Sequence, residues 1–335
     1  MNSIAVVLLN YNGLELLKQF LPKAITHSRQ ASVVLIDNAS NDNSTDWVKT
    51  NYPEIKCIEL RSNLGYAGGY NEGLKHVKAQ YYALVNTDVE LTEGWLTPLL
   101  NHFDSNPSTV ALQPHILDFN KRTHFEYAGA AGGYIDALGI PFCRGRILNH
   151  CEVDHGQYDQ SVPIFWASGA CFVIRSSTFW ELGGFDTRFF AHQEEIDLCW
   201  RIFNEGYNIQ SIGESKVYHI GGATLPPSSK KIFLNHRNSL LMCAKNLPDN
   251  ARFKILLKKL ILDGVIGIVY ALKLNFKATL AIIRAHFSFY KMLKNNQLLR
   301  KKSSQSQNYF LRKNIIIDFF VLRRLNFKDL NKNYK

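Results

Sequence analysis

Apolar and polar segments alternate along the first hundred residues at the spacing of short strands and amphipathic helices. Ile4–Leu9, Val33–Ile36 and Tyr81–Val85 are apolar runs of the kind found in parallel strands that are buried on both faces. Apolar residues between positions 14 and 25 recur at helical spacing. Further helices are predicted at about 66–79 and 95–103, and a further strand near 57–60. This alternation predicts βαβ units and therefore an α/β sheet.

The pattern changes twice further along the chain. Residues 110–165 are rich in Gly, aromatic residues and His, and we expect an irregular segment with loops that lie over a ligand. A strand is expected at Ala170–Ile174, followed by a helix from Ser176 that ends at Gly183-Gly184. Beyond about residue 250, apolar residues are interleaved with Lys and Arg.

The net charge of +11 is distributed very unevenly. Residues 251–335 contain 19 Lys and Arg but 3 Asp and Glu, whereas residues 1–250 carry a net negative charge. Such a segment indicates a polyanionic partner, and because no nucleic-acid-binding motif accompanies it, we expect anionic lipid and no nucleic acid. Leu260–Leu272 is apolar apart from Asp263 but too short to span a bilayer, which predicts a helix lying on a membrane surface. A basic helix packed on the protein body remains the alternative.

Cysteine use and the start of the chain bear on the compartment. The six cysteines are scattered without a Cys-x-x-Cys pair, which favours a reducing environment. No basic region or cleavage site accompanies Ile4–Leu9, so we expect a cytoplasmic protein that is peripheral at the inner face of the cell membrane. The Cys and His residues between Cys143 and His155 lack the ligand spacing of a zinc site.

Polar side chains follow each strong strand pattern of the first half. Asn10-Tyr11-Asn12-Gly13 follows the first strand, Asp37-Asn38 the second, and Asn86-Thr87-Asp88 the strand ending at Val85. Ligands of open α/β sheets bind at these carboxyl ends. A carboxylate such as Asp88 is an oxygen ligand suited to Mg²⁺ or Mn²⁺ on a diphosphate. Simple turns remain the alternative, because Asn and Asp are common turn residues.

Three further motifs contain candidate functional groups. The glycine-rich run 63–73 would let a helix start approach a phosphate or base closely. Glu194, Glu195 and Asp197 begin a helix, where crowding can raise the pKa of one carboxylate toward that of a general base. The helix dipole alone also explains acidic residues at this position. His219 ends a strand pattern and is either a metal ligand or a structural histidine.

In this order the motifs resemble family-2 inverting glycosyltransferases of the GT-A fold, particularly bacterial rhamnosyltransferase-like members, over about residues 3–245. The resemblance rests on Asn10–Gly13, Asp37–Ser40, Asn63–Asn71, Asn86–Asp88, Trp166–Ala170, Glu194–Cys199 and His219–Gly222. It implies a Rossmann-like open mixed sheet flanked by helices. The nucleotide-sugar-binding half would cover residues 1–109, the acceptor-binding half 110–248, and a basic, amphipathic, membrane-associating tail 249–335.

The resemblance also implies roles for individual residues. A metal ion, Mg²⁺ or Mn²⁺, would be held by Asp88 and His219. Asn86 replaces the first carboxylate of the family's usual Asp-x-Asp motif. Glu195 would be the catalytic base where the family usually has Asp, with Asp197 as the alternative base. The nucleotide-sugar contacts would come from Asn10, Asn12, Asp37, Asn38, Gly65, Asn71, Asn86 and Arg237, and the acceptor contacts from Trp166, Gly169, Ala170 and Glu194.

The implied reaction is a single displacement that moves a sugar from dTDP-rhamnose or a UDP-sugar to a hydroxyl of a lipid-linked or cell-surface glycan. Arg144 and Arg146 would then hold the diphosphate of a lipid-linked acceptor. A catalytically inactive glycan- or lipid-binding homologue remains an alternative, because Asn86 and Glu195 depart from the family pattern. A sugar nucleotidyltransferase is disfavoured, because no glycine-rich loop with Arg and Lys follows the first strand.

Overall fold

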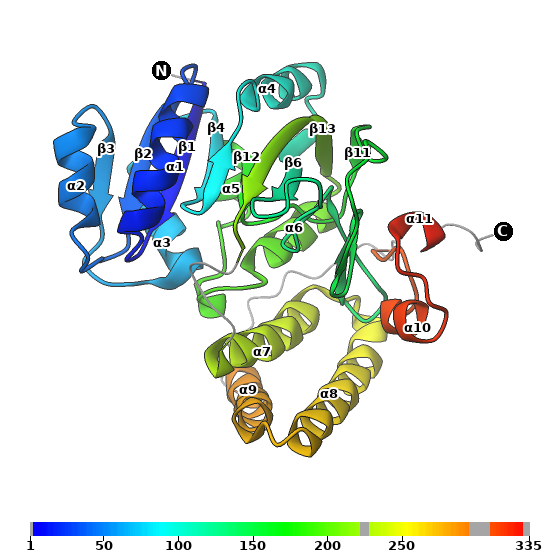
Figure 1. Cartoon of the computed structure of the whole chain (residues 1–335). Coiled ribbons are helices and arrows are strands. Elements are labelled where there is room, and N and C mark those ends of the chain that lie inside the picture. The colour runs from blue at the N-terminus through cyan, green and yellow to red at the C-terminus, as the bar shows by residue number, and fades with distance from the viewer. Residues whose placement is uncertain (1–2, 222–227, 295–308, 331–335) are drawn as a thin grey trace.

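The protein is built around one large mixed sheet (Figure 1). The computed structural model describes residues 3–221, 228–294 and 309–330. In spatial order the sheet runs β11, β13, β6, β12, β4, β1, β2, β3, and β5 pairs with β13. The strands are β1 (Ile4–Asn10), β2 (Ser32–Asp37), β3 (Lys56–Glu59), β4 (Tyr81–Asn86), β5 (Val89–Leu91), β6 (Thr109–Asp118), β11 (Val162–Pro163), β12 (Cys171–Arg175) and β13 (Asn208–His219).

The predicted βαβ units are confirmed by the pairing of their strands. β1 pairs in parallel with both β2 and β4, and β2 pairs in parallel with β3. β12 is antiparallel to β4 and to β6, which makes the sheet mixed. Successive side chains of β1 enter two different cores, because neighbouring residues of a strand point to opposite faces. Burial on both faces explains why this strand is apolar throughout.

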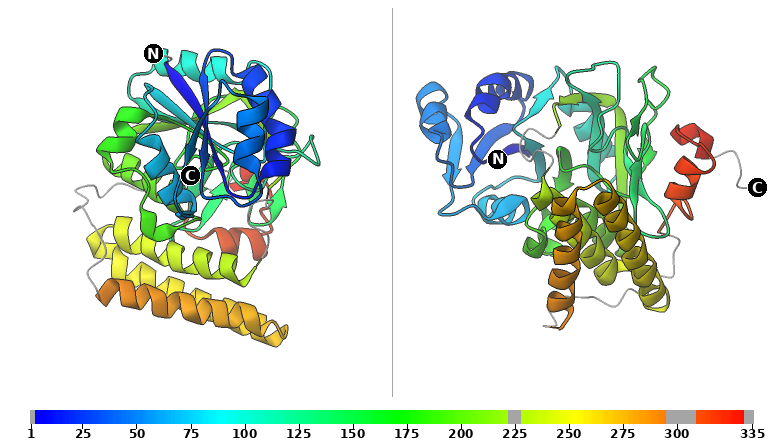
Figure 2. Two further views of the ribbon diagram at one scale, coloured as in Figure 1. Left: turned by 90° about the vertical axis from the view of Figure 1, so that its left-hand side faces the viewer. Right: turned by 60° about the horizontal axis from the view of Figure 1, so that its bottom comes forward.

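Helices cover both faces of the sheet (Figure 2). α1 (Leu14–His27), α2 (Ser44–Asn51) and α4 (Leu96–Ser105) contribute side chains to one core. α3 (Gly65–Leu74), α5 (Ser176–Glu181) and α6 (Glu194–Asn204) contribute to the other. The helix predicted at 66–79 ends earlier, at Leu74, because the chain then turns to bury Val77 before β4 begins.

The expectation of an irregular segment at 110–165 is wrong for its first part. Residues 109–118 form β6, which lies between β12 and β13. Its polar residue Gln113 is fully buried and satisfied: its amide nitrogen lies 3.1 Å from the carbonyl of Gly129, and its oxygen accepts from the amide of Ser168. A second, four-stranded sheet follows, with β7 (Gly133–Ile135), β8 (Pro141–Cys143), β9 (Arg146–Ile147) and β10 (His150–Cys151).

The C-terminal region contains two distinct parts. α7 (Ser229–Asn246), α8 (Asp249–Leu272) and α9 (Phe276–Lys294) form a helical layer beside the sheet domain (Figure 2). Residues 309–330, with α10 (Ile315–Phe320) and α11 (Phe327–Leu330), return to the small sheet, where the amide of Leu311 donates to Ile135. Within the described ranges, no helix has both the length and the apolar character needed to cross a membrane.

Candidate active site

A cavity of about 320 Å³ lies at the carboxyl ends of β1, β2 and β4, where α3 and α6 begin. Open α/β sheets bind ligands at this edge. The structure brings together there these predicted residues: Asn38, Gly65, Asn86, Asp88, Gly169, Ala170, Glu194, Glu195 and His219. Segments from both halves of the chain therefore form a single site.

One wall of the cavity carries a histidine between two carboxylates. Nε2 of His219 lies 3.1 Å from Oδ1 of Asp88, and Nδ1 lies 3.1 Å from Oε2 of Glu126. All three side chains are buried. Burial alone would lower the pKa of His219, but the two carboxylates raise this pKa to about 10. This part of the cavity therefore favours positive charge.

Asp88 and His219 fit a divalent cation, which would replace the Nε2 proton of His219, because only a neutral imidazole binds a metal. A carboxylate oxygen and an imidazole nitrogen are suitable ligands for Mn²⁺, and a carboxylate such as Glu126 behind the imidazole is the usual outer partner of a metal-binding histidine. Among the described residues, no three or more His, Cys, Asp or Glu side chains are grouped so that they could hold a metal ion. Further ligands would therefore have to come from elsewhere, such as a bound diphosphate. The amide of Asn86 lines the same cavity but adds no charge.

Two carboxylates at the start of α6, Glu194 and Glu195, line the same cavity. Burial raises the pKa of Glu194 well above its usual value, and the neighbouring charge of Glu195 adds to this effect. Burial also raises the pKa of Glu195, to about 7, although backbone N–H groups including that of Gly169 partly oppose it. Oε2 of Glu195 has no hydrogen-bond partner among the described residues. A carboxylate with this pKa, facing a cavity, is suited to accept a proton near neutral pH.

Three of the predicted nucleotide-binding residues near β1 and β2 lie outside the cavity. Asn10, Asn12 and Asp37 do not line the cavity. Asp37 accepts from Asn10 at 2.9 Å and from the hydroxyl of Ser40 at 2.6 Å, so its carboxylate organises the loop that presents Asn38. A base contact by Asp37 stays a prediction.

Three other predicted residues also point elsewhere. Asn71 exchanges two hydrogen bonds with the backbone of Phe185, which fixes the turn after α5. Trp166 is buried and donates its ring N–H to the carbonyl of Tyr134, so its face is not an acceptor wall. Arg237 donates to backbone carbonyls before α6 and does not line the cavity.

The alternative base, Asp197, and the two arginines predicted to hold the acceptor diphosphate, Arg144 and Arg146, are all buried inside the protein. Arg144 and Arg146 are both buried and donate to backbone carbonyls, including those of Ala131 and Tyr127, so neither is available to a diphosphate. The carboxylate of Asp197 is fully buried and lies 2.9 Å from Arg201, 2.8 Å from Lys245 and 2.8 Å from the amide of Asn246. Asp197 therefore belongs to a structural ion-pair network.

Replacing Asp197 with Ala should lower the free energy of unfolding by about 3 kcal/mol, because Lys245 and Arg201 would lose a buried counter-charge. Urea denaturation would measure the change. Asp159→Ala is the control, since the half-exposed Asp159 pairs with Lys216 on the surface and should cost less than about 1 kcal/mol. Equal costs for the two variants would contradict the structural role of Asp197.

Sequence reasoning missed several residues that line the cavity. Lys230 and Lys231 come from the first turn of α7, and Lys230 Nζ lies 4.9 Å from the ring centre of Phe190. The only sequence signal for them is the helix cap Ser228, which accepts from the backbone amide of Lys231. His192 also faces the cavity, and burial lowers its pKa to about 4, so its imidazole is neutral at neutral pH. Residues 222–227 of the predicted His-Ile-Gly-Gly motif and its extension lie outside the described residues.

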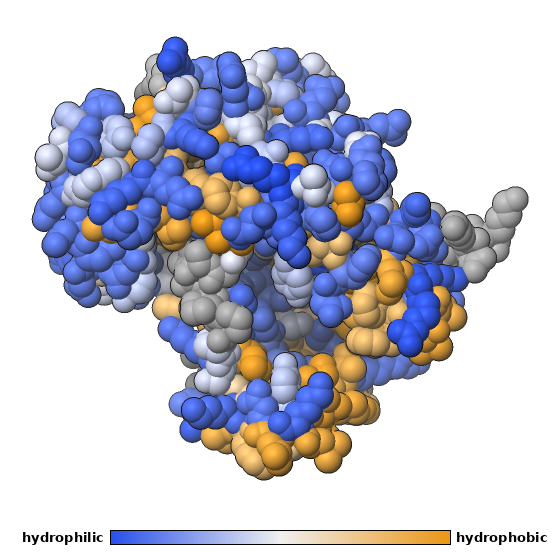
Figure 3. All heavy atoms as spheres, in the orientation of Figure 1, coloured by the Kyte–Doolittle hydropathy of each residue, from blue (hydrophilic) through white to orange (hydrophobic). Residues whose placement is uncertain are grey.

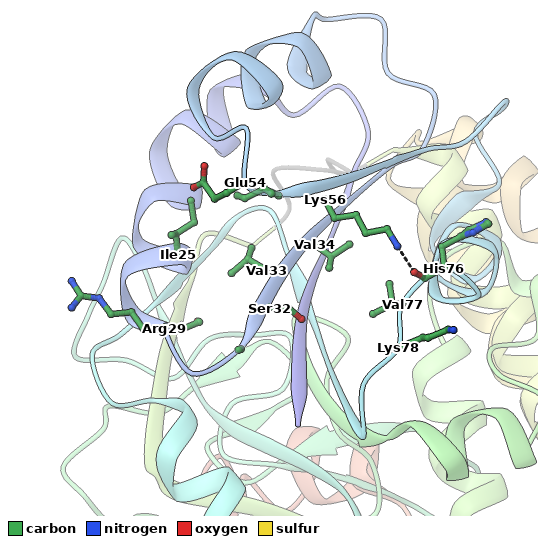
Figure 4. Close-up of a pocket in the computed structure, with 13 residues that line it drawn as sticks. Ile25, Arg29, Ser32, Val33, Val34, Glu54, Lys56, His76, Val77 and Lys78 are labelled. Carbon is green, nitrogen blue, oxygen red and sulfur yellow. Dashed lines mark hydrogen bonds between the residues drawn. The ribbon is translucent and has the colours of Figure 1, made fainter. Parts of the chain in front are cut away.

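A second hollow, of about 520 Å³, lies at the amino ends of β2 and β3 (Figure 4). It contains none of the predicted site residues. The side chain of Lys56 points to the backbone carbonyl of His76 and is hydrogen-bonded to it. This end of the sheet is opposite to the one where α/β proteins bind ligands, so the candidate site remains the cavity at the carboxyl ends.

Comparison with known proteins identifies the class. The family model described as "Glycosyl transferase family 2" matches residues 5–183, more than half of the chain. The chain therefore belongs to glycosyl transferase family 2, and it is a glycosyltransferase with the GT-A fold, as the resemblance predicted.

Two curated relatives share similar identity with the chain. It is 26% identical over 231 residues to N-acetylglucosaminyl-diphospho-decaprenol L-rhamnosyltransferase of Mycobacterium tuberculosis, covering 64% of this chain and 75% of the relative. It is also 26% identical over 249 residues to the low-salt glycan biosynthesis hexosyltransferase Agl10 of Haloferax volcanii. This match covers 72% of this chain and 75% of the relative.

Solved structures support the fold. GalNAc-T7 with UDP, GalNAc and Mn²⁺ superposes with a TM-score of 0.58 at 18% identity, over 72% of this chain and 47% of that one. TarS of S. aureus in complex with UDP-GlcNAc superposes with a TM-score of 0.57 at 14% identity. The superposition covers 86% of this chain and 81% of TarS. At these identities the likeness concerns the fold alone.

Proposed function

We propose that the protein transfers a sugar, with inversion, from a nucleoside-diphosphate sugar to a hydroxyl of a lipid-linked or polysaccharide acceptor. One observation carries this proposal. A carboxylate with a pKa near neutrality, Glu195, and a cation-favouring pair, Asp88 and His219, face the same cavity. A single displacement needs both features, because a base must activate the acceptor while charge on the leaving diphosphate is offset.

Glu195 acts as the base in this mechanism. Its ionised carboxylate accepts the proton of the acceptor hydroxyl as the oxygen forms a bond to the anomeric carbon. The bond between that carbon and the diphosphate oxygen breaks at the same time, and the diphosphate leaves on the opposite face. Gly169 and Ala170 bound the space beside Glu195, so the acceptor would enter along this wall.

The diphosphate would lie at the other wall. Asp88 and His219 would hold Mg²⁺ or Mn²⁺, which would offset the negative charge on the diphosphate. Lys230 and Lys231 line the cavity at the start of α7, where ammonium groups and the helix N-terminus both favour anions. Asn38 would contact the nucleotide from the loop after β2.

The donor and acceptor classes follow from the relatives. The M. tuberculosis relative is named for rhamnose transfer to a decaprenol-diphosphate-linked sugar, and one structural neighbour is in complex with UDP-GlcNAc. We therefore include dTDP-rhamnose and UDP-sugars among the candidate donors, and a lipid-linked glycan as the acceptor.

Thermal-shift measurements with a panel of nucleotide sugars and Mn²⁺ would test the donor class. We expect nucleotide sugars that share one nucleotide to raise the melting temperature of the protein. In a separate assay, the protein should slowly hydrolyse the matching nucleotide sugar. Binding without any hydrolysis or transfer would instead favour an inactive glycan-binding homologue. The absence of any nucleotide-sugar effect would contradict the proposal.

The helices α8 and α9 support a membrane location. The outward face of α8 is apolar, with Ile261 60% and Leu272 79% exposed, whereas its inward face contains the buried Asp263. Asp263 lies 2.8 Å from Nδ1 of His236 in α7 and 3.1 Å from Nε2 of His286 in α9. Soluble proteins place apolar residues inward, so this reversed arrangement requires an apolar partner.

Basic side chains indicate what that partner is. Apolar residues gather on the lower surface of the molecule, over the α8–α9 layer (Figure 3). Exposed basic residues accompany them: Lys254, Lys258, Lys273, Lys277, Arg284, Lys291 and Lys294. Apolar side chains combined with ammonium and guanidinium groups match the interface of an anionic bilayer. We therefore propose that the α8–α9 layer rests on the cytoplasmic face of a membrane, beside lipid-linked acceptors.

Replacing Ile261, Ile268 and Leu272 together with Glu should reduce binding to phosphatidylglycerol vesicles at least tenfold, because three exposed apolar contacts are lost and negative charge is added. Vesicle co-sedimentation would measure this loss. The matched control introduces the same three charges at exposed polar positions of the sheet domain: Gln30, Thr50 and Asn101. Unchanged binding by the α8 variant would contradict the proposed membrane face.

A further inference from the structure

The segment between the short 3₁₀ turn Thr187–Phe189 and α6 has an unusual backbone. Phe190, His192 and Gln193 have φ values of 64°, 71° and 72°, in the left-handed region that residues with a side chain rarely adopt. Three such residues within four positions require support from outside the segment. Strained backbone of this kind is concentrated at functional sites.

This segment, taken together with the last residue of the turn as residues 189–193, forms part of the cavity. Phe190, Ala191 and His192 line it, and α6 with Glu194 and Glu195 follows directly. The carbonyl of Phe190 also accepts from the amide of Ala67 at 3.2 Å, which ties the segment to the start of α3. A change in its backbone would therefore move one wall of the cavity and the helix turn that presents Glu195.

Two neighbouring residues of α7 hold the segment through its carbonyl groups. The amide nitrogen of the fully buried Asn238 lies 2.9 Å from the carbonyl of Phe189, 2.9 Å from that of Ala191 and 2.7 Å from that of His192. Nη2 of Arg237 lies 2.9 Å from the carbonyl of Arg188 and 3.0 Å from that of Phe189.

Arg237 also fixes the orientation of its neighbour. Nε of Arg237 donates to Oδ1 of Asn238 at 2.9 Å. This contact occupies the amide oxygen, so the amide nitrogen must face the carbonyl groups. The two side chains therefore form one hydrogen-bonding unit, and neither faces the cavity.

We infer that Arg237 and Asn238 are a positioning pair, which holds residues 189–193 with Phe190, His192 and Gln193 at positive φ and so places Glu195 for transfer. The inference rests on the proposed function in naming what is positioned. The pair itself does not contact the reacting atoms. Its effect passes through the backbone carbonyls that it binds.

The substitution Asn238→Asp tests the inference with little change in volume. A carboxylate would face the carbonyls of Phe189, Ala191 and His192 without a hydrogen to donate, and the segment would relax. Misplacement of a catalytic group by about 1 Å can cost on the order of 100-fold in rate. We expect kcat for transfer to fall about 100-fold. Nucleotide affinity should change less than about threefold, because Asn38 and Asp88, which would also hold the nucleotide and its metal, lie outside residues 189–193.

Hydrogen–deuterium exchange provides a readout that does not depend on turnover. In the Asn238→Asp variant, the backbone amides of residues 189–193 should exchange at least about tenfold faster. Asn208→Asp is the matched control, because Asn208 is exposed at the start of β13, and it should leave kcat and exchange unchanged. If kcat or the exchange rate in residues 189–193 remains at the wild-type value, the inference is overturned.

A milder variant covers the case in which Asn238→Asp does not fold. Arg237→Gln removes the contacts to Arg188, Phe189 and Oδ1 of Asn238 but keeps the Asn238 side chain and its N–H donors. We expect kcat to fall about tenfold with faster exchange in the same segment, and wild-type values would overturn the inference. If the wild-type protein has no transferase activity with any donor, the proposed function fails, whereas faster exchange in the variants would still support the positioning pair.

Discussion

Replacing Glu195 with Gln should lower the rate of sugar transfer by about 1,000-fold while leaving nucleotide binding almost unchanged. Gln keeps the size of the side chain but cannot accept the proton of the acceptor hydroxyl, and positioned general bases typically contribute 10²- to 10⁴-fold. Single-turnover transfer at saturating donor would measure the loss. Glu205→Gln, at the exposed far end of α6, is the control and should retain full activity. A loss of less than about tenfold in the Glu195 variant would exclude Glu195 as the base.

The pH dependence of the wild-type enzyme tests the same assignment. Burial raises the pKa of Glu195 to about 7, and only the ionised form can accept a proton. The transfer rate should therefore rise with pH up to about 7 and then level off. This rising limb should disappear in the Glu195→Gln variant, because the titrating group is absent. A rate that is flat between pH 5 and pH 8 would contradict the prediction.

The variant Asp88→Asn should weaken Mn²⁺ binding in the presence of nucleotide by about 100-fold and reduce transfer by a similar or larger factor. An amide still offers an oxygen, but the charge at this position is lost, and Asn86 nearby adds none. Titration of Mn²⁺ by electron paramagnetic resonance would measure the affinity directly.

Asn86→Asp provides the matched opposite change at the same site. It adds a carboxylate to the cavity wall, so Mn²⁺ affinity should increase. Unchanged Mn²⁺ affinity in the Asp88 variant would exclude Asp88 as a metal ligand.

The positions of the site segments were accessible from the sequence because they depend on local pattern. The apolar run before Asn86 predicts a strand, and the polar residues after it must then lie at the sheet edge that binds ligands. The apolar face of the helix that begins at Glu194 predicts that Glu195 and Asp197 lie near the rim of a pocket, and this is wrong for Asp197, which is fully buried away from the cavity. Both segments reach the cavity.

Local pattern was insufficient where polar residues are buried. β6 contains Gln113 and His115, whose polar side chains concealed a strand that is buried except at its last residue. Gln113 is satisfied by Gly129, Ala130 and Ser168, which are distant in sequence. No local signal indicates that such partners exist, so the sequence pattern alone predicts an irregular segment.

The sequence by itself determined the alternation of strands and helices over residues 4–103 and the polar motifs at the strand ends, because periodicity and turn chemistry involve only neighbouring residues. The tertiary structure alone decided which polar side chain faces the cavity. Asp197, two residues after Glu195, turns into the protein because Lys245 and Asn246 meet it there. Arg237 binds backbone carbonyls instead of phosphate, and His219 joins Asp88 across 131 residues. These side-chain orientations depend on packing between elements that are distant in the chain.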